Sequence, residues 1–217
     1  KLGHDAWVTH SEVACAVSDS PYGDFTPCRM ILGKGEKGSW DADVVHNPTV
    51  LKEGGKYYLY YTGNYGNGEY WNHRNHQRVG VAVAENPLGP WRRFDRPLID
   101  VTAGSFDHLA TNNPTVTRGR DDKFHMLYKA VGNGPLPKGG AVVCGTAVAG
   151  NPEGPFVKSS VPIMTNPDND WAVEDPFIWF QEGFYWALVK DFQGYFTKRG
   201  KNTMALFQSV DGVNWKP

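Results

Sequence analysis

The amino-acid sequence predicts an all-β protein, and more specifically a β-propeller. The chain has 217 residues, and its 25 glycines, 15 prolines and 13% aromatic residues suit short strands that alternate with turns. Strand and turn motifs also recur about every 65 residues. Four short antiparallel strands repeated around an axis are typical of a propeller, whereas a sandwich would not need the same turn at the same phase of every repeat. No segment shows a helical pattern.

Each repeat begins with a strand that opens on two polar residues and a proline. The prolines of these opener strands are 66 and 62 residues apart. Because the first strand of each blade lines the axis of a propeller, we expect the three openers to lie side by side around one axis. The openers are predicted over 44–51, 110–117 and 173–180, and their prolines are Pro48, Pro114 and Pro176.

The other strands of each repeat follow in a fixed order. An aromatic strand comes after a tight turn, then a long loop, and then a third strand that ends in a proline–glycine turn. The turn prolines Pro21, Pro87 and Pro152 are 66 and 65 residues apart. A short return strand closes each repeat. The aromatic strands are predicted over 56–61, 123–128 and 184–189, and the return strands over 27–32, 93–98 and 157–163.

The whole chain, 1–217, is predicted to form a single propeller domain that is incomplete. Its blade segments are 1–33, 40–100, 106–164 and 168–217, and the first holds only the second half of a blade. The chain therefore contains about three and a half blades, whereas closed propellers have about 4 to 8. An open ring leaves strand edges unpaired. We therefore expect exposed apolar edges at both ends, and another chain or a missing segment of a longer polypeptide that completes the propeller.

Composition and charge exclude several classes of function. The formal net charge is −1 and the lysines and arginines are scattered, so the chain has no basic stripe for a nucleic acid. No apolar run approaches the roughly 18 residues of a membrane span, and the first residues show no signal-peptide pattern. The three cysteines, Cys15, Cys28 and Cys144, lack metal-ligand spacing and are interpreted as free thiols, with at most one disulfide.

The openers also predict where a ligand would bind. Amides, carboxylates and an imidazole around one cavity suit a hydroxyl-rich ligand such as a sugar. The alternative is that Asn and Asp before proline are ordinary turn residues. Superposing the repeats gives two sets of equivalent residues, His46, Asn112 and Glu174, followed by Asn47, Asn113 and Asp175.

Other polar and aromatic residues are candidates for contact with such a ligand. An aromatic–Asp pair precedes each of the first two openers, and long loops follow the aromatic strands. Aromatic rings stack on sugar rings and cationic side chains bind hydroxyls or carboxylates, although lysines are more often simply solvated. His73 and His76 lack companion ligands, so no metal site is predicted. The candidates are Asp41, Trp71, Arg74, Asp107, Lys129, Trp171, Lys190 and Asp191.

The openers and the aromatic strands after them resemble those of the five-bladed β-propeller glycoside hydrolases, namely glycoside hydrolase family 43 and its relatives in families 32, 62, 68 and 117. The motifs concerned are the three openers, the run 55–61 and Gly183-Phe-Tyr-Trp186. The resemblance implies a five-bladed propeller and a secreted or periplasmic glycosidase that degrades a plant or algal polysaccharide or oligosaccharide. It implies no cofactor, and it leaves open a structural calcium ion on the propeller axis.

The resemblance further implies an inverting mechanism with a Glu general acid and an Asp general base. Glu174, two residues before the opener proline, stands at the position of the acid. An Asp that tunes this acid is expected one blade earlier, where this chain has Asn113. The base would lie upstream of residue 1, and Asp107 or Asp41 would compensate for the absent Asp. We expect the charge of Asp175 and burial to raise the pKa of Glu174.

Two alternatives stay open. In a register shifted by one blade, Asp175 would be the tuning residue and the acid would lie beyond Pro217. Asn47 would then stand at the place of the base, a role that an amide cannot fill. In the other alternative, the propeller binds a glycan or a protein without chemistry, and Glu174 and Asp175 are a turn pair.

Overall fold

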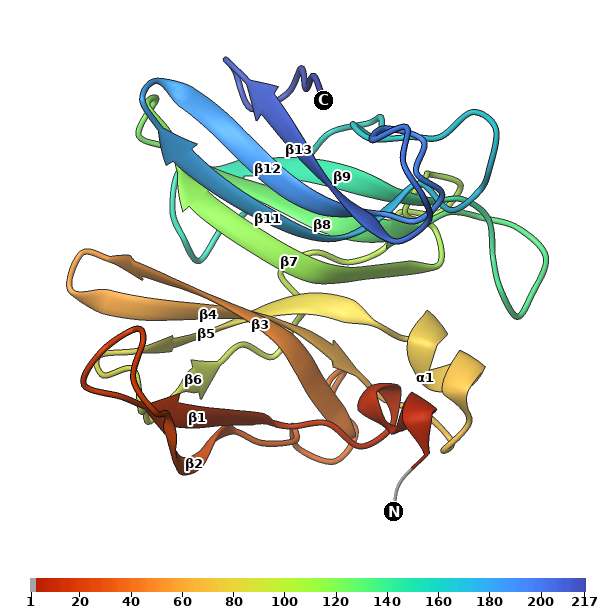
Figure 1. Cartoon of the computed structure of the whole chain (residues 1–217). Coiled ribbons are helices and arrows are strands. Elements are labelled where there is room, and N and C mark those ends of the chain that lie inside the picture. The colour runs from red at the N-terminus through yellow and green to blue at the C-terminus, as the bar shows by residue number, and fades with distance from the viewer. Residues whose placement is uncertain (1–2) are drawn as a thin grey trace.

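A computed structural model describes residues 3–217 as four small antiparallel sheets, which confirms the all-β fold (Figure 1). Two short helical turns accompany them, η1 (His4–Val8) and α1 (Tyr70–Asn75). The strands are β1 (Val13–Val17), β2 (Thr26–Leu32), β3 (Val44–Glu53), β4 (Lys56–Asn64), β5 (Arg78–Ala84), β6 (Arg92–Arg93), β7 (Ala110–Arg118), β8 (Phe124–Val131), β9 (Val142–Ala149), β10 (Val157–Lys158), β11 (Val173–Gln181), β12 (Phe184–Asp191) and β13 (Thr203–Ser209).

Each sheet is a blade whose strands run in sequence order. The second and third blades have the orders β3-β4-β5-β6 and β7-β8-β9-β10, the fourth has β11-β12-β13, and the first holds only β1-β2. Hydrogen bonds join the opener strands of neighbouring blades. Thr49 Oγ1 donates to the Pro114 carbonyl at 2.8 Å, and the Ile178 N–H donates to Thr115 Oγ1 at 3.2 Å. The openers β3, β7 and β11 are therefore neighbours around one axis, as predicted.

All three openers carry the same bulge next to their proline. At this point each opener has one residue more than the strand it pairs with, as the shift of register shows. The residue before each proline is left-handed, with φ of 48° at Asn47, 49° at Asn113 and 50° at Asp175. Asn and Asp tolerate this conformation better than other residues with a side chain. We call these three the tip residues.

A buried ion pair fastens the second blade to the segment that precedes it. Asp41 Oδ2 accepts hydrogen bonds from the Tyr61 hydroxyl at 2.8 Å and from Arg93 Nη1 at 2.7 Å. The Trp40 ring stacks on Tyr61, with centroids 5.6 Å apart. A Cβ atom on Gly80 would lie 2.4 Å from this indole, so only glycine fits there. We call this arrangement the aspartate clamp.

The third blade repeats the aspartate clamp with equivalent residues. Asp107 Oδ2 accepts hydrogen bonds from the Tyr128 hydroxyl at 3.2 Å and from Lys158 Nζ at 2.6 Å. Phe106 takes the place of the indole, since a Cβ atom on Gly145 would lie 2.9 Å from its ring. Each clamp joins the chain before an opener to the second and the outermost strand of the same blade. The repeated aromatic–Asp pair therefore has a structural explanation.

The hydrophobic core lies between blades rather than inside one sheet. Side chains of β4, β5, β8 and β9 pack together between the second and third blades, and those of β8, β11, β12 and β13 pack between the third and fourth. Both faces of the middle blades are covered, so their strands are buried along most of their length. This packing fixes the angle between openers and hence the spacing of the tip residues.

Two details differ from the sequence-based expectations. The outer strands of the second and third blades are only two residues long. Further along, Ile99 and Met164 each form an isolated β-bridge, with Val79 and Cys144 respectively. Pro97 and Pro162 lie in the interrupted stretches, where proline has no N–H to donate. The turn α1 was also not predicted, because six residues are too few to show a helical period.

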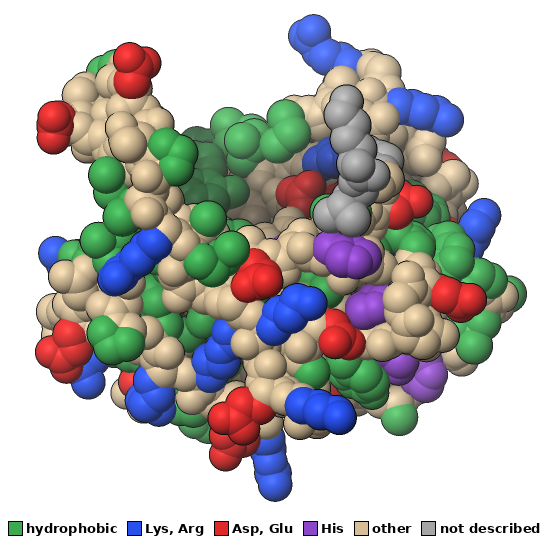
Figure 2. Space-filling view, turned by 90° about the horizontal axis from the view of Figure 1, so that it is seen from below, with side chains coloured by type: hydrophobic (Ala, Val, Ile, Leu, Met, Phe, Trp, Pro, Cys, Tyr) green, Lys and Arg blue, Asp and Glu red, His purple; other side chains and the backbone are tan. Residues whose placement is uncertain are grey.

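The ring of blades is open, and apolar side chains are exposed on both of its end blades. Phe177, Met204 and Leu206 of the fourth blade are 54%, 53% and 49% exposed, and Val17 and Met30 of the first blade are similarly exposed. Figure 2 shows a hollow on one face with hydrophobic side chains in its depth. The expectation of exposed apolar residues at both ends is confirmed. Among residues 3–217, no helix is long and apolar enough to span a membrane.

Candidate active site

The tip residues and the long loops lie at the same end of the propeller. The first residue of β3, Val44, pairs with the last of β4, Asn64, so the loop after β4 begins beside the opener. In Figure 1 this is the end that carries α1 and η1. The structure brings the three tip residues together around a hollow of about 130 Å³. It is lined by Asn47, Pro48, Thr49, Asn113, Pro114, Asp175 and Pro176.

Asp175 is the carboxylate at the centre of this hollow. Its Oδ1 accepts a hydrogen bond from Asn113 Nδ2 and a longer one, 3.5 Å, from Asn47 Nδ2. Loss of hydration and the nearby negative charge of Glu174 raise the pKa of Asp175 above its ordinary value. The two equivalent amides therefore hold the oxygen in place, and the hydrogen bond from Asn113 opposes part of the rise in the pKa of Asp175.

Glu174 is held between two ammonium groups. Its Oε1 accepts a hydrogen bond from Lys129, and its Oε2 accepts one from Lys190 at 3.3 Å. Burial alone would raise the pKa of Glu174, but the two positive charges outweigh it, so the pKa is lowered. The expected rise in the pKa of Glu174 is therefore wrong. The two lysines sit at equivalent places on β8 and β12, paired with Asn112 and Glu174.

Buried polar side chains, linked to one another by hydrogen bonds, contact the tip residue Asn47. His46 Nδ1 is hydrogen-bonded to Asn47 Oδ1, and its Nε2 lies 3.0 Å from the Gln77 amide nitrogen. Asn112 Nδ2 donates to Gln77 Oε1. His46 is 6% exposed and Asn112 is fully buried, so both lie beneath the tip residues rather than beside them. Gln77, on the loop before β5, was not singled out from the sequence.

His46 should make stability depend on pH. Burial, together with a smaller effect from the charge of Lys129, lowers the pKa of His46 from 6.5 to about 4, although the hydrogen bond to Asn47 opposes this change. The unfolded chain then takes up this proton near pH 6.5 while the folded protein does not, so the stabilisation is complete above pH 6.5 and is lost toward pH 4. The free energy of unfolding should fall by up to about 3 kcal/mol over this range. Urea unfolding of the protein and of His46→Gln measures it, and equal pH dependence in both would contradict this origin.

An aromatic rim borders the site. Trp7 of η1 packs edge-on against His46, with ring centroids 5.4 Å apart, and against Tyr70 at 6.1 Å. Tyr70 in turn contacts Trp71 at 5.0 Å. Trp7 is 39% exposed, so part of its ring is free to contact a ligand. Trp7 was not singled out from the sequence, because it lies far along the chain from every opener.

Arg74 lies behind this rim and is buried, at 5% exposure. Its Nη1 donates to the Lys138 carbonyl at 2.9 Å and to Asn75 Oδ1 at 3.0 Å, and its guanidinium lies 5.6 Å from the centre of the Trp71 ring. Burial lowers the pKa of Arg74, while the negative charge of Glu174 opposes that change. No carboxylate within residues 3–217 forms a salt bridge with it.

Four of the candidates lie apart from the tip residues. Asp41 and Asp107 are bound in the aspartate clamps. Trp171 packs against Phe192, with centroids 5.0 Å apart, in a small cluster between blades. Asp191 is fully buried and accepts hydrogen bonds from three successive N–H groups, 195–197, so it orders the loop after β12. These contacts give the four residues structural roles.

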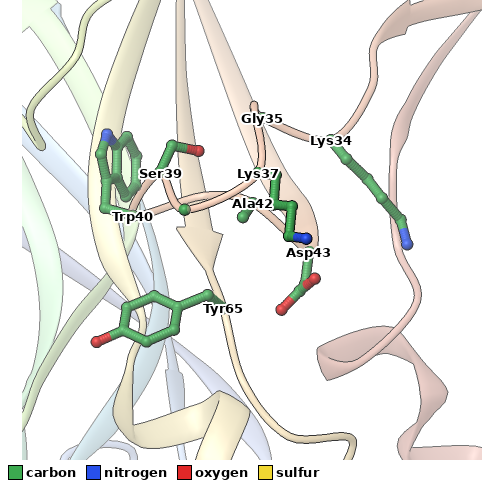
Figure 3. A pocket seen from close by; sticks show the side chains of 9 residues that line it. Lys34, Gly35, Lys37, Ser39, Trp40, Ala42, Asp43 and Tyr65 are labelled. Carbon is green, nitrogen blue, oxygen red and sulfur yellow. The ribbon is translucent and has the colours of Figure 1, made fainter.

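A larger cavity, of about 760 Å³, lies beside the segment that precedes β3, and none of the tip residues lines it (Figure 3). Most of its lining comes from the loop before β3, and Tyr65, after β4, faces that loop. No group of three or more His, Cys, Asp or Glu side chains in the described part of the chain is placed to hold a metal ion.

No protein-family model and no curated protein sequence matches this chain. Solved structures do match it. A family 117 glycoside hydrolase of the marine bacterium Zobellia galactanivorans is 26% identical, with a TM-score of 0.72, over 94% of this chain and 54% of that one. A second glycoside hydrolase is 19% identical, with a TM-score of 0.76, over 94% and 63%. The arabinanase of Bacillus subtilis is 17% identical, with a TM-score of 0.67, over 94% and 66%.

The chain spans between about half and two thirds of the length of these structures. The similar structures include hydrolases of families 117 and 43 and a fructan hydrolase of Cichorium intybus, all five-bladed propellers. The resemblance deduced from the openers is confirmed. The chain has the fold of part of a five-bladed β-propeller, the fold that these glycoside hydrolases share.

Proposed function

We propose that this protein hydrolyses glycosidic bonds in a plant or algal polysaccharide or oligosaccharide. The observation that carries the proposal is the carboxyl pair Glu174 and Asp175 at an opener tip, surrounded by amide and ammonium donors. Such groups suit a hydroxyl-rich ring, and the aromatic rim beside them offers faces for stacking. Because these glycans lie outside the cells that degrade them, we place the protein in a secreted or periplasmic location.

The charges suggest which carboxyl carries the proton. Inverting hydrolysis needs one protonated carboxylic acid and one carboxylate, about 6.5–9.5 Å apart. Loss of hydration and the charge of Glu174 raise the pKa of Asp175, whereas Lys129 and Lys190 lower the pKa of Glu174. We therefore assign the proton to Asp175, in place of the assignment to Glu174 made from the sequence. Glu174 then holds the two ammonium groups at the edge of the sugar site.

A second candidate function is a propeller that binds a glycan without cleaving it. The observation that favours it is the amide at two of the three tips, Asn47 and Asn113, since an amide cannot act as a general base. The clamped Asp41 and Asp107 do not supply this base either, because Arg93 and Lys158 hold their carboxylates. Both candidate functions require a glycan ligand, but only the hydrolase would release a sugar product.

A screen for product release tests the proposal. The protein would be incubated with aryl glycosides and with plant and algal oligosaccharides, and the first product would be followed by proton NMR. Release of a sugar with inverted anomeric configuration is the expected result. Retained configuration would reject the inverting mechanism while keeping the hydrolase. Binding without release would favour the second candidate, and a folded protein that neither binds nor cleaves any glycan would contradict both.

A further inference from the structure

Positive charge exceeds negative charge around the opener of the fourth blade. Lys129 and Lys190 both contact the single carboxylate of Glu174, Lys190 at 3.3 Å. One carboxylate balances only one of the two ammonium groups. Lys129 is 8% exposed, so water screens the remaining charge poorly.

The surrounding groups do not remove this excess. Arg74 adds a buried cation that forms no salt bridge within the described residues, and Glu174 is near enough to influence its pKa. His46 is uncharged near neutral pH, since its pKa is about 4. Asp175 is the other anionic group; within the described residues it forms no salt bridge, and its Oδ1 accepts hydrogen bonds from the amides of Asn47 and Asn113. Three cations, Lys129, Lys190 and Arg74, therefore outnumber the two carboxylates, Glu174 and Asp175.

We propose that this site takes a glycan bearing an anionic substituent, a carboxylate or a sulfate ester, which Lys190, Lys129 and Arg74 recognise. This inference rests on the proposed function, in which the ligand is a carbohydrate, and it adds that the carbohydrate carries a negative charge. An uncompensated buried cation costs solvation free energy, which an anion recovers through charge-assisted hydrogen bonds. The side chain of Lys190 is 32% exposed, so an arriving anion can reach it first.

Binding of matched oligosaccharides tests this inference. The three probes are an oligogalacturonate, the same oligosaccharide with its carboxylates reduced to neutral galactose, and a sulfated galactan oligosaccharide. We expect at least one anionic probe to bind about tenfold more tightly than the neutral one in isothermal titration calorimetry at low salt. The preference should shrink as salt rises. The two anionic arms distinguish carboxylate from sulfate.

Variants locate the preference at this site. Lys190→Met should remove most of the tenfold preference, whereas Lys56→Met is the matched control, because Lys56 is the exposed first residue of β4, at the opposite end of that strand from the long loop. Glu174→Gln should strengthen binding of the anionic probe, since it removes the carboxylate that competes for the two lysines. A gain of affinity cannot arise from partial unfolding.

The outcomes separate this inference from the proposed function. Equal affinity for the neutral and anionic probes, or weaker anionic binding by Glu174→Gln, would overturn the inference, and sugar release would still support the hydrolase. Tight anionic binding without sugar release from any glycan would keep the inference and reject hydrolysis. A protein that is folded by circular dichroism yet binds none of the three probes would overturn the inference outright.

Discussion

Asp175→Asn is expected to lower the turnover of a natural glycoside by about 10²–10⁴-fold, the range typical of a lost proton donor. Asn keeps the shape of the side chain and fits the left-handed tip, as Asn47 and Asn113 do at φ of 48° and 49°. The sugar should therefore still bind, and the loss should fall on kcat rather than on KM. Steady-state kinetics and calorimetric binding of an uncleaved glycoside measure the two effects separately.

The leaving group distinguishes the two carboxyls. A dinitrophenyl group departs without a proton, so Asp175→Asn should slow dinitrophenyl glycosides far less than natural ones. Glu174→Gln is the matched variant at the neighbouring residue, and it should slow both substrate classes alike, because it changes the lysines that hold every sugar. The reverse pattern, in which Glu174→Gln alone spares dinitrophenyl substrates, would show that Glu174 is the proton donor.

Asp41→Ala is expected to lower the free energy of unfolding by about 3 kcal/mol, the lower end of the cost of breaking a buried ion pair. The carboxylate is 3% exposed, and it partners both Arg93 and the Tyr61 hydroxyl. Alanine leaves the guanidinium and the hydroxyl without this partner in a site that water reaches poorly. Equilibrium unfolding in urea gives the change, and Asp41→Asn is a milder variant that keeps the volume.

Asp107→Ala is the matched test in the next blade. Because Lys158 and Tyr128 repeat the contacts of Arg93 and Tyr61, the loss of stability should be similar. Glycan affinity of the folded fraction should be unchanged in both variants. Unaltered stability together with lost glycan binding would restore the sequence-based view that Asp41 and Asp107 contact the ligand.

The repeat made the architecture predictable from the sequence. Proline spacing identified the opener of each blade, and the bulge at each proline is a local feature that a short motif specifies. For the same reason, superposing the motifs placed Asn47, Asn113 and Asp175 together, and the structure joins them by hydrogen bonds. Properties encoded within one repeat could be deduced in this way.

Properties that depend on contacts between blades could not be deduced. Burial alone would raise the pKa of Glu174, but Lys129, which lies on the neighbouring blade, and Lys190 lower it, so the direction was predicted wrongly. Asp41 was interpreted as a site residue because the aromatic–Asp pair recurs in the next blade, but the pair recurs because each Asp forms an aspartate clamp. Trp7 and Gln77 reach the site from outside the repeated motifs, so no pattern marked them.

Because all three tip residues have a left-handed backbone, Asn and Asp can replace each other at any of the three tips. Asn and Asp have nearly the same size and both tolerate this backbone, so one exchange adds or removes an acid on the axis without moving a strand. A single base change in a codon achieves it. Asn47→Asp would therefore place a second carboxyl group beside Asp175, whose Oδ1 lies 3.5 Å from Asn47 Nδ2.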